Sequence, residues 1–182
     1  VGATVGLGVI PLLSTPTDPY AHCGAQDRHL DRAWSPVVAA RARAAFAQTN
    51  LGYADDAWQR VAGVLADYQT EWMASYAQAC DGLTDDTVSR TQSLHELACL
   101  ERQRSELEAV SWQLTNADAR TVEAAMAVVQ TLKTPGDCDV DGPLPAPSSA
   151  EARTAVEAVR SEITRIRAAL LVGHSDAAAS LA

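Results

Sequence analysis

The apolar residues between positions 55 and 80 recur with the period of an α-helix, and no other feature of the sequence limits the fold so tightly. The stripe comprises Trp58, Val61, Leu65, Tyr68 and Trp72, at steps of three, four, three and four residues. That spacing places all five side chains along one face of a helix. A helix of this kind buries its apolar face against other elements, so we expect a helix of about residues 55–80 inside a bundle.

Further helices are predicted on the same grounds. Ser35 and Pro36 form an N-cap and a first-turn proline for a helix over residues 36–49, which ends at residues 50–52. A long helix over residues 84–114 carries leucines every seven residues at Leu100, Leu107 and Leu114. Asp85 and Asp86 would stabilise its N-terminal end, where the helix dipole is positive. Residues 24–34 have a mixed pattern that we also read as helical.

Two more helices complete the prediction. Asn116 is expected to cap a shorter helix, whose apolar face would be Val122, Ala125, Met126, Val129 and Leu132. The last long helix spans residues 150–172, and its apolar stripe is Val156, Val159, Ile163, Ile166 and Leu170. Gly173 would close it, and Ser175 would cap another helix. Residues 134–148 include Pro135, Pro143, Pro145 and Pro147, and we expect no helix there.

These elements predict an all-α fold, an antiparallel helical bundle with short connections. The expected units are an apolar segment at residues 1–13, a linker at 14–22, a bundle at 23–133, a proline-rich loop at 134–148 and a helix pair at 149–182. Residues 1–13 are nearly all apolar but shorter than the ~20 residues of a membrane span. Because the first residue is Val1 and not methionine, we interpret this segment as the end of a severed membrane helix. A signal-peptide remnant and a buried strand or arm are the alternatives.

Charge and motifs exclude several functions. The formal net charge is −9, and the 14 basic residues are scattered among acids, so nucleic-acid binding is not expected. The chain has no phosphate-binding glycine loop and no G-x-S-x-G motif, and residues 28–31 lack the order of a kinase catalytic loop. We therefore expect a non-catalytic segment that needs no cofactor.

The four cysteines, Cys23, Cys80, Cys99 and Cys138, allow two disulfides in three connectivities. In a hairpin that turns near residue 51, facing residues have numbers that sum to about 102, as Cys23 and Cys80 do. A second hairpin turning near residue 115 brings Cys99 towards residue 131, a short loop before Cys138. We predict the pairs Cys23–Cys80 and Cys99–Cys138 and hence an oxidising compartment. The alternative is four reduced, buried cysteines in the cytoplasm.

Two short motifs suggest metal ligands. His95 and Cys99 lie four residues apart and would share a helix face, as in metalloproteases, but no third ligand follows from the spacing. Asp137, Asp139 and Asp141 before Gly142 copy the first half of a calcium loop, whereas position twelve is Ser148 instead of glutamate. A core cysteine beside a surface histidine, and a solvated acidic turn, are the interpretations that we adopt.

The order of particular residues resembles a segment of large bacterial serine/threonine protein kinases that end in tetratricopeptide repeats, a type frequent in myxobacteria-like genomes. In that family the segment lies between the membrane helix and the repeats. The matching residues are Cys23, Trp34, Ala45, Phe46, Thr49, Tyr53, Ala54, Trp58, Tyr68, Trp72, Ala79, Cys80, Arg90, Leu97, Ala98, Cys99, Leu100, Arg102, Leu114, Asp118, Cys138, Asp139 and Val140. Residues 1–13 would match the end of the membrane helix. Leu170, Leu171, Gly173, Ala177 and Ala178 would match the start of the first repeat.

The resemblance implies a non-catalytic sensor or interaction segment of a membrane-anchored kinase, on the periplasmic side of the bacterial inner membrane. Its implied partners are proteins or peptides, a second copy in a homodimer, and the membrane through the N-terminal segment. The kinase domain itself has no counterpart among these 182 residues. The alternative function is a cytoplasmic scaffold of the tetratricopeptide type, in which residues 150–182 form an interaction helix pair.

Overall fold

The computed structural model describes residues 23, 29–84, 87–139, 149–174, 176 and 179, and within these residues the fold is all-α, as predicted. The helices are α2 (Pro36–Gln48), α3 (Ala54–Gly82), α4 (Thr87–Thr115), α5 (Ala119–Val129) and α6 (Ala150–Leu171), with a short 3₁₀ helix, η2 (Pro135–Asp139). No strand occurs in these ranges.

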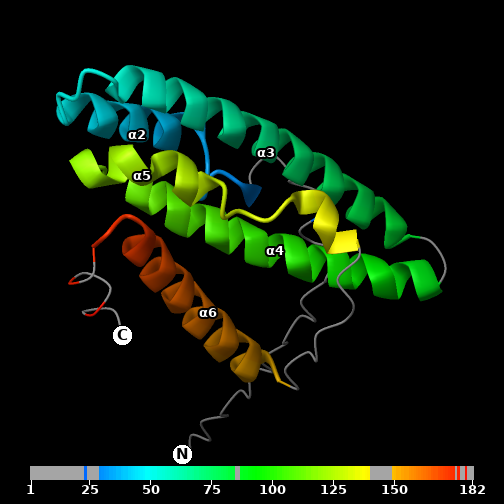
Figure 1. Cartoon of the computed structure of the whole chain (residues 1–182). Coiled ribbons are helices and arrows are strands. Elements are labelled where there is room, and N and C mark those ends of the chain that lie inside the picture. The colour runs from blue at the N-terminus through cyan, green and yellow to red at the C-terminus, as the bar shows by residue number, and fades with distance from the viewer. Residues whose placement is uncertain are drawn as a thin grey trace, which may run out of the picture.

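Two long antiparallel helices, α3 and α4, run the length of the molecule (Figure 1). Helices α2 and α5 pack against both of them at one end, and η2 occupies the space between α3 and α4 further along. Each helix turns back on its predecessor through a short connection, so α2 to α5 form an antiparallel bundle.

The core lies where α2, α4 and α5 cover the apolar stripe of α3. All five stripe residues of α3 are buried, as the periodicity predicts, and so are the heptad leucines of α4, at exposures of 0–1%. An aromatic cluster closes one end of the core, because the ring of Trp58 lies 6.3 Å from that of Trp34 and 5.6 Å from that of Phe46. Aromatic pairs at such distances add to the stabilisation from burial.

Some helix caps are the ones that the sequence predicts, and one is different. The Ser35 hydroxyl accepts a hydrogen bond from the Val38 N–H at the start of α2, as predicted. Asn50 ends that helix with a φ of 56°. The cap of α5 is Asp118 and not Asn116, since the Asp118 carboxylate accepts from the Thr121 N–H. The Asn116 side chain instead donates to the Trp112 carbonyl of the preceding helix.

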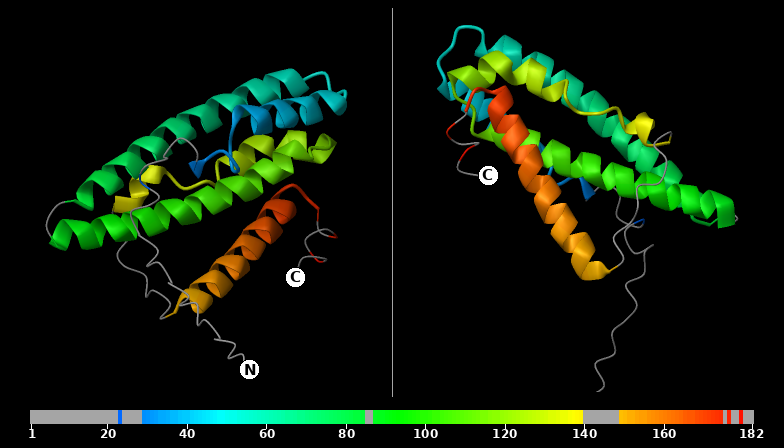
Figure 2. Two further views of the ribbon diagram at one scale, coloured as in Figure 1. Left: turned by 180° about the vertical axis from the view of Figure 1, so that it is seen from behind. Right: turned by 60° about the horizontal axis from the view of Figure 1, so that its bottom comes forward.

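Helix α6 lies outside the bundle and contacts α4 and the end of α5 (Figure 1). Figure 2 shows that α6 diverges from α4 towards its own N-terminal end. The predicted apolar stripe of α6 is not its buried face, because Val159, Ile163 and Leu170 are 59%, 43% and 54% exposed. The residues buried against the bundle are Ala168 and Ala169, with Val172 just past the helix end. Small alanines allow a close approach at this end only.

Two further predictions differ from the structure. The sequence predicts a helix over residues 24–34, of which residues 29–34 are described. His29 is helical, but residues 30–34 form turns and bends. The sequence predicts no helix over residues 134–148, but η2 begins at Pro135, because the missing N–H of proline is not needed at a first helical position.

Several predictions fall on residues that the structure does not describe. These are the segments 1–13, 14–22 and 140–148, and Asp85, Asp86, Ser175, Ala177 and Ala178. No described helix is both long and apolar enough to cross a bilayer.

Candidate functional site

Two disulfides brace the bundle, and they join the pairs that the hairpin register predicts. Cys23 is bonded to Cys80, which attaches the segment before α2 to the last turns of α3. Cys99 is bonded to Cys138, which attaches η2 to the middle of α4. Free cysteines are absent from the described residues. Paired cysteines indicate an oxidising, extracytoplasmic compartment.

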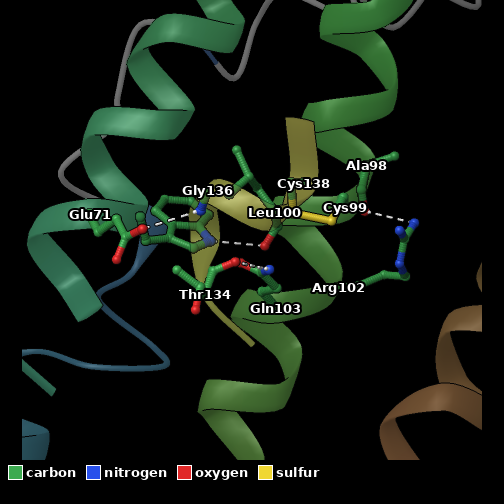
Figure 3. The surroundings of a disulfide bond; sticks show 10 residues. Glu71, Ala98, Cys99, Leu100, Arg102, Gln103, Thr134, Gly136 and Cys138 are labelled. Carbon is green, nitrogen blue, oxygen red and sulfur yellow. Dashed lines mark hydrogen bonds between the residues drawn. A yellow bond between two sulfur atoms is a disulfide. The ribbon is translucent and has the colours of Figure 1, made fainter. Parts of the chain in front are cut away.

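Hydrogen bonds reinforce the second disulfide on either side (Figure 3). Trp72 of α3 donates its indole N–H to the Leu100 carbonyl at 2.9 Å, one residue after Cys99. The Gln103 amide donates to the Thr134 carbonyl at 3.2 Å, and the Gly136 N–H donates to the Glu71 carboxylate at 3.3 Å. The chain from Thr134 to Cys138 is thereby held against both long helices.

The two metal motifs do not assemble a site in the described residues. His95 is half-buried on α4, but the sulfur of Cys99 is bonded to Cys138 and is not a thiolate ligand. Asp137 and Asp139 lie in η2, and Asp141 and Ser148 lie outside the described residues. No group of three or more His, Cys, Asp or Glu side chains within the described ranges is arranged around a common point.

A groove of about 490 Å³ lies between α4, the chain after α5, and α6. Its residues are Glu106, Val110, Thr131, Leu132, Lys133, Thr164, Arg167, Ala168, Leu170 and Leu171. A second hollow of about 260 Å³ continues it towards the N-terminal end of α6 and shares Glu106, Thr164 and Arg167. The groove follows from the divergence of α6, since the two helices touch at one end and separate at the other (Figure 2).

One acidic residue, Glu106, and two basic residues, Lys133 and Arg167, line this largely apolar groove. Burial raises the pKa of the Glu106 carboxyl, and the nearby charges of Lys133, Arg102 and Arg167 act in the opposite direction. The apolar lining comes from Val110 of α4, Leu132 after α5, and Leu170 and Leu171 of α6. A groove that combines apolar and charged lining in this way is typical of surfaces that bind proteins or peptides.

Exposed apolar residues continue from the groove over the outside of α6. Val159 and Ile163 are exposed on the helix itself, and Leu170 and Leu171 are exposed beside the groove, where Leu171 is 46% exposed. The periodicity predicts that this stripe is buried, which is wrong for Val159, Ile163 and Leu170, and no sequence pattern predicts the groove. The available signal for the exposure was the row of arginines and glutamates beside the stripe, which is typical of helix pairing at a surface.

Comparison with protein-family models, with curated proteins and with solved structures finds no match to this chain.

Proposed function

We propose that this chain is a non-catalytic protein-interaction domain that works in an extracytoplasmic compartment and binds its partner through α6 and the adjoining groove. The observation that carries the proposal is the exposure of the α6 apolar stripe on a rigid, disulfide-braced bundle. Val159 and Leu170 are both more than half exposed, although each belongs to a regular apolar stripe. Clustered apolar exposure of this kind marks interaction sites.

The more specific proposal is a sensor segment of a membrane-anchored bacterial serine/threonine kinase, between its membrane helix and its tetratricopeptide repeats. It is supported by the ordered residue matches from Cys23 to Val140, and the disulfides agree with a periplasmic position. Partner binding to α6 would alter the proximity of kinase domains across the inner membrane. No residue of this chain is assigned a catalytic role.

Thiol mapping in cells tests the location and separates the proposal from a cytoplasmic scaffold. Intact cells that express the natural gene are quenched with an alkylating reagent, and the non-reduced digest is analysed by mass spectrometry. We expect the two cross-linked peptides that contain Cys23–Cys80 and Cys99–Cys138. Four alkylated cysteines after this quench would contradict an extracytoplasmic domain and favour the cytoplasmic scaffold of the tetratricopeptide type.

The coding sequence upstream of Val1 and downstream of Ala182 tests the parentage. We expect a kinase domain followed by a completed membrane span on the upstream side, and helical repeats on the downstream side. A gene that encodes neither a kinase domain nor a membrane span would refute the kinase assignment, while the interaction role of α6 would still be open to the binding experiment below.

A further inference from the structure

The apolar stripe of α6 has the spacing of a coiled-coil seam. Its five residues occupy successive a and d positions of a heptad, with Val156, Ile163 and Leu170 at a, and Val159 and Ile166 at d. Val159 is the most exposed of them at 59%, and Val156 and Ile166 are half-buried. The first four seam residues are β-branched. At the a positions, Val156 and Ile163, this matches two-stranded coiled coils, whereas at d, where Val159 and Ile166 stand, two-stranded seams usually carry leucine.

Among the described residues, the exposed part of this seam, Val159, Ile163 and Leu170, is open to another helix, because α6 uses mainly a different face to contact α4. The groove and its continuation are lined from α6 by Glu157, Arg160, Thr164, Arg167, Ala168 and Leu171. At about 100° per residue, the centre of that set lies roughly a quarter turn or more from the centre of the seam. Ile163 and Leu170 border both faces. A helix that packs on the seam would therefore lie beside α4 without displacing it.

The charges that flank the seam favour a second α6 in parallel orientation. Glu162 occupies a g position, and Arg167, five residues later, occupies the following e position. In parallel coiled coils a g residue faces the e residue five positions on in the other helix, so Glu162 of one copy would face Arg167 of the other. An antiparallel pair would instead bring the e-position arginines, Arg160 and Arg167, close to each other.

Nothing in the described structure holds these charges strongly elsewhere. Glu162 forms an exposed ion pair with Arg165 at 3.5 Å, and such surface pairs exchange readily. The Arg167 charge acts on Glu106 from across the groove. In the proposed pair, Glu162 of the second copy would be a further negative charge near Arg167. We propose that α6 is a dimerisation helix that pairs in parallel with α6 of a second copy of this chain. This deepens the proposed interaction role by naming the partner.

Sedimentation equilibrium of the whole oxidised chain at 0.15 M salt tests the proposal, since salt screens the repulsion between two chains of net charge −9. We expect a concentration-dependent dimer. Val159→Asp should abolish it, and the exposure of Val159 means that the helical content should be unchanged. Glu162→Arg should weaken it about tenfold, because two attractive contacts become repulsive. Ala158→Arg is the matched control, because Ala158 is exposed at a c position that belongs neither to the seam nor to the face that lines the groove. This variant should leave the dimer intact.

Orientation is tested by Val156→Cys under mild oxidation. Only a parallel pair brings two copies of residue 156 within the Cα separation of about 4.4–6.8 Å that a disulfide needs. We expect a covalent dimer from Val156→Cys and none from Ala158→Cys. A folded chain that stays monomeric at all concentrations, or a dimer indifferent to Val159→Asp, would overturn the proposal. A dimer without the Val156→Cys cross-link would overturn its parallel form. Neither result bears on the thiol mapping, which tests the compartment separately.

Discussion

The Asp118 carboxylate lies 2.9 Å from the His174 imidazole, and this contact joins the N-cap residue of α5 to the turn that follows α6. The other carboxylate oxygen of Asp118 accepts from the Thr121 N–H at 2.8 Å and from its hydroxyl at 2.9 Å. His174 is placed by the end of α6, where its N–H bonds to the Ala169 carbonyl. One side chain therefore starts α5 and fastens α6 to it.

This arrangement predicts an acid-sensitive contribution to stability. Partial burial acts to raise the pKa of Asp118, but hydrogen bonds from Thr121 and His174 outweigh it and lower the pKa from 3.8 to about 2. A carboxyl whose pKa is depressed in the folded state stabilises that state above its unfolded pKa, and the contribution is lost as pH falls from about 4 to about 2. Asp118→Ala should lower the free energy of unfolding by about 1 kcal/mol at pH 7. Urea unfolding should show this deficit shrinking below pH 4.

His174→Ala is the matched control for that prediction. It removes the contact with α6 and leaves the Thr121 cap intact, so we expect a smaller loss than for Asp118→Ala. A deficit for Asp118→Ala that stays constant between pH 7 and pH 2 would show that the carboxylate charge has no part in it.

The buried indole of Trp72 is expected to be a main support of the α3–α4 interface. It is fully buried and donates its N–H to the Leu100 carbonyl. Trp72→Phe should lower the free energy of unfolding by about 1–3 kcal/mol, since it removes a buried hydrogen bond and leaves a cavity. Trp112→Phe, at a side chain that is 52% exposed, should change it by less than about 0.5 kcal/mol. Equal effects of the two variants in urea titrations would contradict this assignment.

Periodicity predicts which face of a helix is apolar, and the fold follows from the sequence to that extent. It does not predict what covers that face, which is why the stripe of α3 is buried as expected and Val159 of α6 is exposed. Cap residues are ambiguous for a similar reason. Asn116 and Asp118 are both common N-cap types two residues apart, and the choice depends on the backbone of Asp118, which is extended.

The groove was beyond sequence reasoning because its residues come from three elements far apart in the chain. Gln103 is a different case, because it lies three residues after Leu100 and four before Leu107, so the helical period places this polar residue on the buried face of α4. It is 2% exposed, because the chain before η2 covers it and the Thr134 carbonyl accepts its amide N–H. The disulfide pairs were more predictable, because the two hairpin turns place the cysteines of each pair near each other, although Cys23 and Cys138 lie outside the α-helices.

Removing the disulfide between Cys99 and Cys138 should destabilise the bundle. The double variant Cys99→Ala/Cys138→Ala frees a loop of 39 residues in the unfolded chain, and the free energy of unfolding should fall by about 2–4 kcal/mol. Hydrogen exchange at the Gly136 amide should also accelerate, because η2 would be left with its hydrogen bonds alone. Slow exchange at this amide in the variant would show that η2 does not depend on the disulfide. Cys23→Ala/Cys80→Ala, which opens a different loop, should leave that exchange rate close to the wild-type value.

Two glycines should respond to alanine in opposite directions, because their backbones differ. Gly63 lies inside α3, where an added Cβ would meet no atom within 4 Å apart from the neighbouring backbone of its own helix, so Gly63→Ala should raise the free energy of unfolding by about 0.5–1 kcal/mol. Gly173 has a φ of 77° and donates its N–H to the Leu170 carbonyl at the end of α6. An alanine there is strained although the space is open, and Gly173→Ala should lower the free energy of unfolding by about 1 kcal/mol.

Because this turn also positions His174, Gly173→Ala combined with Asp118→Ala should lower the free energy of unfolding by less than the sum of the two single losses. Additive losses in urea titrations would show that the turn and the α5 cap act independently.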